Sequence, residues 1–335
     1  MRCAAWLTLV VLTGAAWSCL PPQPRLPREL KTEILVRHTP IKQQGTLPTD
    51  WAYAMTSLIE SDRLAVGDSV NLSAQSLVRA ACYDAWLGRH AGARAVSPAG
   101  GTGFTALRLL RTYGLFTYDE YPDTLYPSAA RLSRQLARAT TPARAQQLLD
   151  EALGYLPPMV HLYGATYTPQ ELALSMTEPD TYEALMSDGR QPWFAVGRYA
   201  AKGTEGGRAL NLPPDAMVDT VVSTLRRGYS LMWQGDLDEA CCQPECGLAL
   251  WPVSRRRTNA RERQRDLDAG LTTLNHSMHL IGLARDAQGR RYFILKTAHG
   301  TGGRTHGYFL MGENYLRMKT ILLFRRHLRP LRPEP

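Results

Sequence analysis

Large apolar residues recur every three or four positions through the first two thirds of the chain. This spacing places them on one face of a helix, and it predicts a helix that begins at Asp50 and covers 50–66. Ser73 is a candidate N-cap of the next helix, and Gly114 is a candidate stop signal further along. Helices are predicted in the same way from 72, over 106–113 and 128–153, from 168, and over 213–227.

The last third of the chain carries shorter apolar runs of the kind that form strands. A turn at 286–289 separates two of these runs and predicts a β-hairpin. The polar segment 254–268 ahead of them is predicted to be a mobile loop. Because helices come first and an antiparallel sheet comes last, the pattern predicts the α+β class. The expected strands cover 229–233, 276–283, 291–296 and 307–311.

The first residues have the pattern of an export signal. A short basic start and an apolar run over 4–17 are typical of a secretory signal peptide over 1–18. Two endings fit this pattern: signal peptidase would cut near Ala16 or Ser18, or Cys19 would become a lipidated N-terminus in a loose lipobox. We therefore expect export to the periplasm or the outer membrane of a cell envelope. In the second case a lipid on Cys19 would be the only membrane contact.

The rest of the chain is expected to form one domain rather than two. The Pro-rich stretch 19–40 is predicted to be an extended tether. The domain is expected to cover 41–323, with a helical insertion near 128–190, and a basic tail is expected over 324–335. This division assigns nearly all of the mature chain to one folded unit.

Composition and charge narrow the classes of protein further. The 335 residues are 44% hydrophobic and 21% charged, which excludes a disordered chain and allows a sizeable core. No apolar run after the N-terminus reaches the roughly 18 residues that a membrane-spanning helix needs. The formal charge is +9; removal of Arg2 leaves 38 basic residues instead of 39 against 30 acidic ones, or +8. Because the arginines are spread widely and no nucleic-acid-binding motif occurs, we expect no nucleic-acid partner.

The spacing of cysteine and histidine argues against a metal centre. No CxxC pair occurs among the six cysteines. In an oxidising compartment the four cysteines that follow Cys19 would form up to two disulfides, or they would remain loop thiols. His299 and His306 could be read together with His276 and Asp50 as metal ligands. Scattered loop histidines, however, are usually not ligands. We therefore predict no metal and no other cofactor. The four cysteines are Cys82, Cys241, Cys242 and Cys246.

Several motifs resemble, in order, those of the papain-like cysteine peptidases. The segment 44–54 resembles the family's active-site opening, where a Gln precedes a Cys-Trp pair at the start of the central helix. His276 begins the segment that resembles the strand carrying the family's catalytic His. The segment 296–301 stands where the family has Lys-Asn-Ser-Trp-Gly-Thr. Further similar motifs are 72–78, the pair Gly100-Gly101 with the helix after it, and Gly307-Tyr308.

Within that family the sequence is most similar to the aminopeptidase C and bleomycin-hydrolase-like branch. The resemblance implies a papain-like cysteine peptidase fold, with a cleft between a helical lobe and an antiparallel-sheet lobe. It also implies that a peptide or protein ligand binds in the cleft, against Gly100 and Gly101. The likeness runs from about Gln43 to Lys319. Its branch-specific segments are 167–170, 211–215, 227–229 and Trp233.

The sequence departs from the family at the reacting positions. The resemblance implies that Gln44 would hold an oxyanion and that His276 would transfer protons, but Asp50 stands at the position of the nucleophilic Cys. Thr297 stands where the family's Asn orients the His, and would accept a hydrogen bond from it. His299 replaces the indole that shields that pair. At a helix N-terminus Asp50 is a favourable cap, ionised and able to pair with a protonated His276.

These substitutions predict an exported pseudopeptidase that binds a peptide or protein without hydrolysing it. A carboxylate is a poor nucleophile toward an unactivated amide, because the product would be a mixed anhydride. No cysteine and no Gly-x-Ser-x-Gly motif offers a replacement nucleophile. Two alternatives stay open: a hydrolase with residual activity that depends on His276, and a structural envelope lipoprotein with a vestigial cleft.

Overall fold

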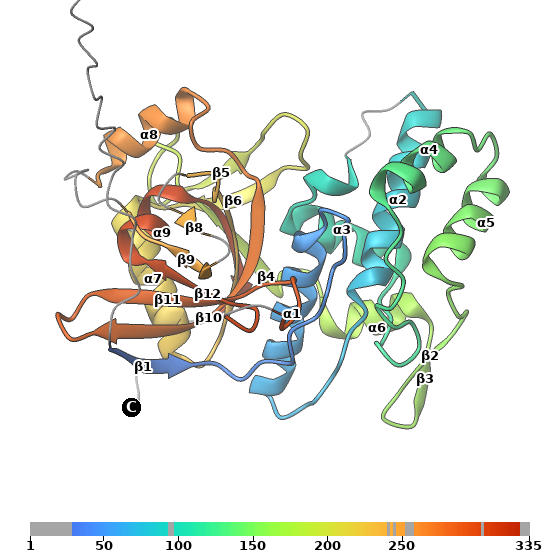
Figure 1. The fold of residues 1–335 in the computed structure, drawn as a ribbon, viewed down its shortest axis with the longest axis horizontal. Helices are drawn as coiled ribbons and strands as arrows, with labels where there is room; N and C mark the ends of the chain where they lie inside the picture. The colour runs from blue at the N-terminus through green and yellow to red at the C-terminus, as the bar shows by residue number, and fades with distance from the viewer. Residues whose placement is uncertain are drawn as a thin grey trace, which may run out of the picture.

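The protein has a helical lobe and a sheet lobe that meet along one central helix (Figure 1). This helix, α1 (Asp50–Ala65), is buried at every position from Trp51 to Asp62, which is the pattern of a helix enclosed by protein on all sides. Within the described residues no helix is long and apolar enough to cross a membrane. The computed structural model describes residues 29–92, 97–239, 242–243, 246–251, 258–302 and 305–328.

The helices begin and end close to the signals in the sequence. Ser73 caps α2, where its hydroxyl accepts a hydrogen bond from the amide of Ser76 at 3.0 Å. Gly114 ends α3 with a φ of 89°, in the region that glycine adopts at little cost. Besides α1, the helices are α2 (Ala74–His90), α3 (Gly103–Tyr113), α4 (Ala129–Ala137), α5 (Pro142–Leu153), α6 (Pro169–Met176), α7 (Pro214–Arg226), α8 (Ala260–Asp268) and α9 (Glu313–Lys319), with a 3-10 turn at Pro98–Gly100.

Eleven strands of the described residues form one mixed, mostly antiparallel sheet in the order β5-β6-β4-β13-β7-β10-β11-β12-β9-β8, with β1 also paired to β10. β2 and β3 form a separate hairpin in the helical lobe. The strands are β1 (Leu30–Leu35), β2 (Val160–Leu162), β3 (Ala165–Tyr167), β4 (Tyr182–Met186), β5 (Val196–Tyr199), β6 (Gly207–Asn211), β7 (Leu231–Gly235), β8 (Cys242–Gln243), β9 (Leu248–Ala249), β10 (His276–Asp286), β11 (Arg291–Lys296), β12 (Tyr308–Gly312) and β13 (Thr320–Arg326).

Strand β10 joins the two lobes because its side chains alternate between two cores. Met278 and Leu280 belong to the hydrophobic cluster that α7 covers. His279, between them, points toward α1 and is hydrogen-bonded to Ser57 at 2.7 Å. This alternation follows the two-residue repeat of a strand. It places polar side chains of β10 directly against the central helix.

The structure corrects four of the expected boundaries. The predicted tether 19–40 contains β1, which adds a strand to β10. The predicted loop 254–268 contains α8, because Asn259 caps this helix and the guanidinium of Arg263 is buried and donates to two backbone carbonyls. The predicted insertion 128–190 is helical only in part, since it also supplies the β2–β3 hairpin and β4 of the main sheet. Strand β13 continues to Arg326, inside the predicted tail.

A buried acid on α1 makes stability depend on pH. Asp62 is 1% exposed, and neither of its carboxylate oxygens has a hydrogen-bond partner among the described residues. Burial raises the pKa of Asp62 to about 7, and the Tyr182 hydroxyl and Arg326 offset only part of that rise. An acid with a raised pKa in the folded state contributes stability that is present below about pH 4 and is lost as pH rises through about 7.

We therefore expect Asp62→Asn to stabilise the protein at pH 8, by at most about 4 kcal/mol, and to have little effect near pH 4. Denaturant unfolding of both proteins from pH 4 to 8 measures this difference. Asp119→Asn, at an exposed position, is the control and should follow the wild type throughout. Parallel curves for wild type and Asp62→Asn would show that the Asp62 carboxyl is not perturbed.

Candidate functional site

The first residue of α1 lies beside the start of β10. The segment before α1 is held against the loop after β11, because the amide of Gln44 donates to the carbonyl of Ala298 at 2.8 Å. This contact directs Asp50 toward the sheet, where its Oδ2 accepts a hydrogen bond from the amide of Ser277 at 2.8 Å. The N-cap position of α1 is Thr49, and Asp50 is the first helical residue, whose carboxylate accepts from the amide of Trp51 in the same turn and from Ser277 of the opposite lobe.

A neighbouring asparagine that the motif comparison missed fixes His276. The Nδ1 of His276 lies 3.0 Å from the Oδ1 of Asn275. That oxygen also accepts from the amide of Leu237 at 3.0 Å, while the Asn275 amide group donates to Asp236 at 2.9 Å. Because Oδ1 is an acceptor, Nδ1 carries the proton and Nε2 keeps its lone pair. An Asn directly before the His was the only sequence signal for this contact.

Thr297 does not orient His276, contrary to the expectation from the resemblance. Its hydroxyl donates to the carbonyl of Gly307 at 3.0 Å, which closes the loop between β11 and β12. The short threonine side chain is thus used locally. Asn275 supplies the hydrogen bond that the family's asparagine would supply from the Thr297 position.

The expected ion pair between Asp50 and His276 is not formed among the described residues. Burial raises the pKa of Asp50 to about 6, although hydrogen bonds from the amides of Ser277 and Trp51 oppose the rise. Burial lowers the pKa of His276, with Asp238 opposing and His299 reinforcing the change. At neutral pH Asp50 is therefore an anion, as pairing requires, but His276 is neutral and lacks the positive charge that an ion pair needs.

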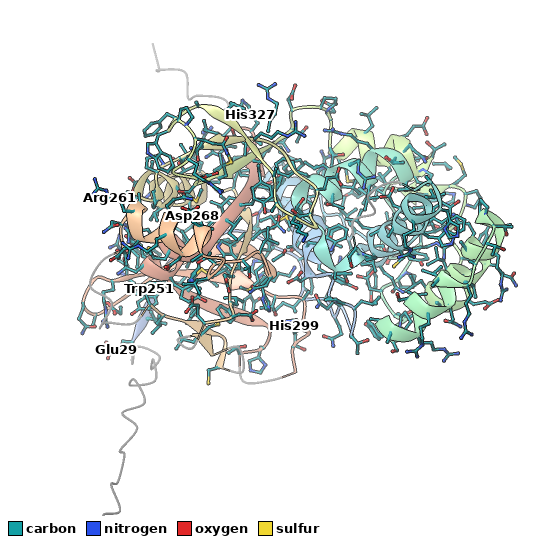
Figure 2. All side chains as sticks on the ribbon, turned by 90° about the horizontal axis from the view of Figure 1, so that it is seen from above. Glu29, Trp251, Arg261, Asp268, His299 and His327 are labelled. Atoms are coloured by element: carbon teal, nitrogen blue, oxygen red, sulfur yellow. The ribbon has the colours of Figure 1, made fainter. Side chains whose placement is uncertain are left out.

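Two cavities lie on either side of Asp50. The outer cavity, of about 80 Å3, opens between the lobes, and His299 lies at the edge where the lobes meet (Figure 2). The inner cavity, of about 10 Å3, is no larger than a water molecule. The outer cavity is lined by Asp50, Leu237, Gly247, His276, Ser277, Met278, Thr297, Ala298, His299, Thr305, Tyr308 and Phe309. The inner cavity is lined by Lys42, Asp50, Tyr53, Ala54, Ser57, Ser277, His279, Lys296, Thr297 and Ala298.

The predicted glycine pair lies outside both cavities. The indole of Trp51 lies against Gly101, so that a Cβ there would be 2.1 Å from the ring. A Cβ on Gly100 would be 2.8 Å from the carbonyl oxygen of Gly203, in the turn between β5 and β6. Gln44 also lies outside both cavities, and its Oε1 is buried without a partner among the described residues. The structure therefore brings together Asp50, His276 and Thr297, but not the other predicted site residues.

Among the described residues no cysteine lines either cavity. Cys82 is buried beneath α4 and α5, and burial raises its pKa to about 12. Cys242 is buried in the sheet lobe, and Cys246 is partly exposed next to Gly247 at the rim of the outer cavity. Cys19 and Cys241 lie outside the described residues. The described residues also contain no cluster of His, Cys, Asp and Glu that could hold a metal ion.

Comparison with solved structures shows the fold. The crystal structure of PepW from Lactobacillus rhamnosis matches with a TM-score of 0.67 at 15% identity, over 88% of this chain and 82% of that one. The chain has the papain-like fold. A structure from a study of the mite allergens Blo t 1 and Der p 1 (TM-score 0.44, 17% identity) covers 87% of this chain and 68% of that one, and procathepsin L2 from Tenebrio molitor larval midgut (TM-score 0.46, 16% identity) covers 87% and 65%. No family model and no curated protein matches the sequence.

On this papain-like fold the site holds an anion, a neutral imidazole and several hydroxyls around a small cavity. The carboxylate of Asp50 can accept hydrogen bonds, and the free Nε2 of His276 can accept a proton. Neither group can attack an amide to form a stable acyl intermediate. The arrangement is therefore equipped to bind polar groups and to transfer protons.

Proposed function

We propose that this protein is an exported pseudopeptidase, which binds a peptide or protein between its lobes without hydrolysing it. One observation carries the proposal: a carboxylate, Asp50, occupies the N-terminus of α1 and faces the outer cavity beside His276. Peptide hydrolysis on such a site requires a thiolate made by a neighbouring imidazolium. Here no thiol lines the cavity, and the lowered pKa of His276 disfavours the imidazolium.

The cleft itself supports a retained binding role. Gln234 links the lobes, because its amide group donates to the Ser277 hydroxyl at 2.9 Å and its Oε1 accepts from the amide of Gly103 at 3.0 Å. This contact ties α3 of the helical lobe to β7 and β10 of the sheet lobe, and Ser277 of β10 lines the outer cavity. Export to the periplasm or outer membrane, with or without a lipid on Cys19, is proposed on the pattern of the first residues alone.

We expect the purified protein to show no turnover of fluorogenic peptide amides and no labelling by peptidyl epoxides that alkylate papain-type cysteines. The same protein should retain members of a random peptide library. Thr305→Phe, which places a large side chain on the wall of the outer cavity, should reduce that retention. Turnover by the wild type that disappears in His276→Ala would establish a residual hydrolase instead. Absence of all peptide retention would leave only a structural role.

A further inference from the structure

Asp50 is an anion without a counter-ion. Its Oδ2 accepts from the backbone amide of Ser277 at 2.8 Å, and no cationic side chain is among the groups that perturb it. A desolvated carboxylate of this kind gains free energy when a cation binds it, because hydrogen bonds between charged partners are about twice as strong as neutral ones. Among the described residues Asp50 accepts hydrogen bonds only from backbone amides, those of Ser277 and Trp51, and it lines the outer cavity.

The charged groups around Asp50 are engaged elsewhere. Lys42 pairs with Glu60 at 2.6 Å, and Lys296 donates to Ser57 at 2.8 Å and to Thr39 at 3.1 Å. The two histidines of the cavity, His276 and His299, have lowered pKa values because of burial, so both are neutral at pH 7. The positive charge that Asp50 lacks must therefore come from the ligand.

The shape of the cleft favours a ligand that ends at the cavity. On the glycine side, the turn between β5 and β6 lies against Gly100 and is fixed by Glu205. The guanidinium of Arg108 donates to both carboxylate oxygens of Glu205, at 2.7 and 2.9 Å, and the Thr102 hydroxyl donates to its carbonyl at 2.9 Å. A chain that ran past Gly100 would meet this turn, whereas the outer cavity is lined on its own side by His299.

We propose that the outer cavity binds a primary ammonium group, with Asp50 as its counter-ion. An ammonium carries three N–H donors. The acceptors on the wall are the carboxylate of Asp50, the Nε2 of His276 and the hydroxyl of Thr305. The group would be supplied by the α-amino terminus of a peptide or by a lysine side chain. This inference rests on the proposed peptide-binding function and names the part of the peptide that is bound.

Three pools of random pentapeptide amides test the proposal: free N-termini without lysine, acetylated N-termini with one lysine, and acetylated N-termini without lysine. We expect immobilised protein to retain at least one of the first two pools about 10- to 100-fold better than the third, as expected for a charged hydrogen bond. Preference for the first pool identifies the α-amino group, and preference for the second identifies lysine. Equal retention of all three pools overturns the ammonium site but not peptide binding, and retention of none overturns both.

The pH dependence of binding by the wild type provides a measurement that needs no variant. Affinity should fall below about pH 6, where Asp50 takes up a proton, whereas the lowered pKa values of His276 and His299 keep both imidazoles neutral at pH 7. An α-amino ligand should therefore bind best between about pH 6 and 8, and a lysine ligand up to about pH 10. Affinity that is constant from pH 5 to 8 would contradict the proposal.

Asp50→Asn is the direct test, because the amide keeps an acceptor for Ser277 but removes the charge. We expect it to lower the retention of the ammonium-bearing pool about 10- to 100-fold and to remove the loss of binding near pH 6. Asp238→Asn is the matched control: Asp238 is exposed, perturbs His276 and does not line either cavity. It should bind like the wild type. If both variants weaken binding equally, the ligand responds to the general electrostatic potential of the region and not to a direct contact with Asp50.

Discussion

Replacing Glu60 by glutamine should lower the free energy of unfolding by about 3–5 kcal/mol, the usual effect of breaking a buried ion pair. Glu60 lies on α1 and is 0% exposed. Its Oε1 accepts from Lys42 at 2.6 Å and from the amide of Leu72 at 2.7 Å, while Oε2 accepts from the Thr39 hydroxyl. The variant would leave the partly buried Lys42 without its counter-ion.

The loss of the Glu60 charge also affects Lys296, because Glu60 attracts both Lys42 and Lys296 electrostatically. Burial lowers the pKa of Lys296 to about 8, and Glu60 opposes that change. Thermal unfolding should show a fall in Tm of roughly 6–20 °C for Glu60→Gln. Glu178→Gln, at an exposed position, should change stability by less than about 0.5 kcal/mol. A second change, Lys42→Met, should restore part of the loss; no recovery would mean that the hydrogen bond to Leu72 matters more than the charge.

The sequence predicted helices where local signals coincide, and it failed where partners are distant. The cap at Ser73 and the stop at Gly114 act within one turn, so the ends of α2 and α3 follow from the chain alone. Helix α8 has a polar sequence with no apolar face, and it is held instead by the buried guanidinium of Arg263. Glu60 was missed for the same reason, since a buried charge and a solvated one look alike in a sequence.

The predictions for the site also depended on whether the partners of a residue are local or distant. Motif order placed Asp50 and His276 together correctly, because both positions are set by the start of an element, α1 and β10. Asp50 is ionised at neutral pH as predicted, but the protonated state expected of His276 was wrong, because burial lowers the pKa of that imidazole. The role predicted for Thr297 was wrong, because its hydroxyl donates to a carbonyl within its own loop. Asn275, the residue directly before His276, makes the hydrogen bond to the histidine instead.

Because Asn275 and not Thr297 bonds to His276, we expect a second large effect: Asp50→Cys alone should create peptidase activity. The thiol would stand at the N-terminus of α1, facing the same cavity as the Nε2 of His276. That nitrogen is free to act as a general base, because Asn275 holds the proton on Nδ1. We expect turnover of a fluorogenic peptide amide to exceed that of the wild type by at least about 100-fold, the lower range for a positioned base.

Combination variants separate the residues that carry this activity. Thr297→Asn should add little to Asp50→Cys, because the Nδ1 of His276 is already engaged by Asn275 at 3.0 Å. Asn275→Ala should remove most of the gained activity by freeing the imidazole, with the protein still folded. Asp238→Cys, an exposed thiol on the neighbouring loop, controls for unspecific thiol chemistry and should give no turnover. An Asp50→Cys protein that is alkylated but hydrolyses nothing until Thr297→Asn is added would show that Asn275 does not serve the histidine as the geometry requires.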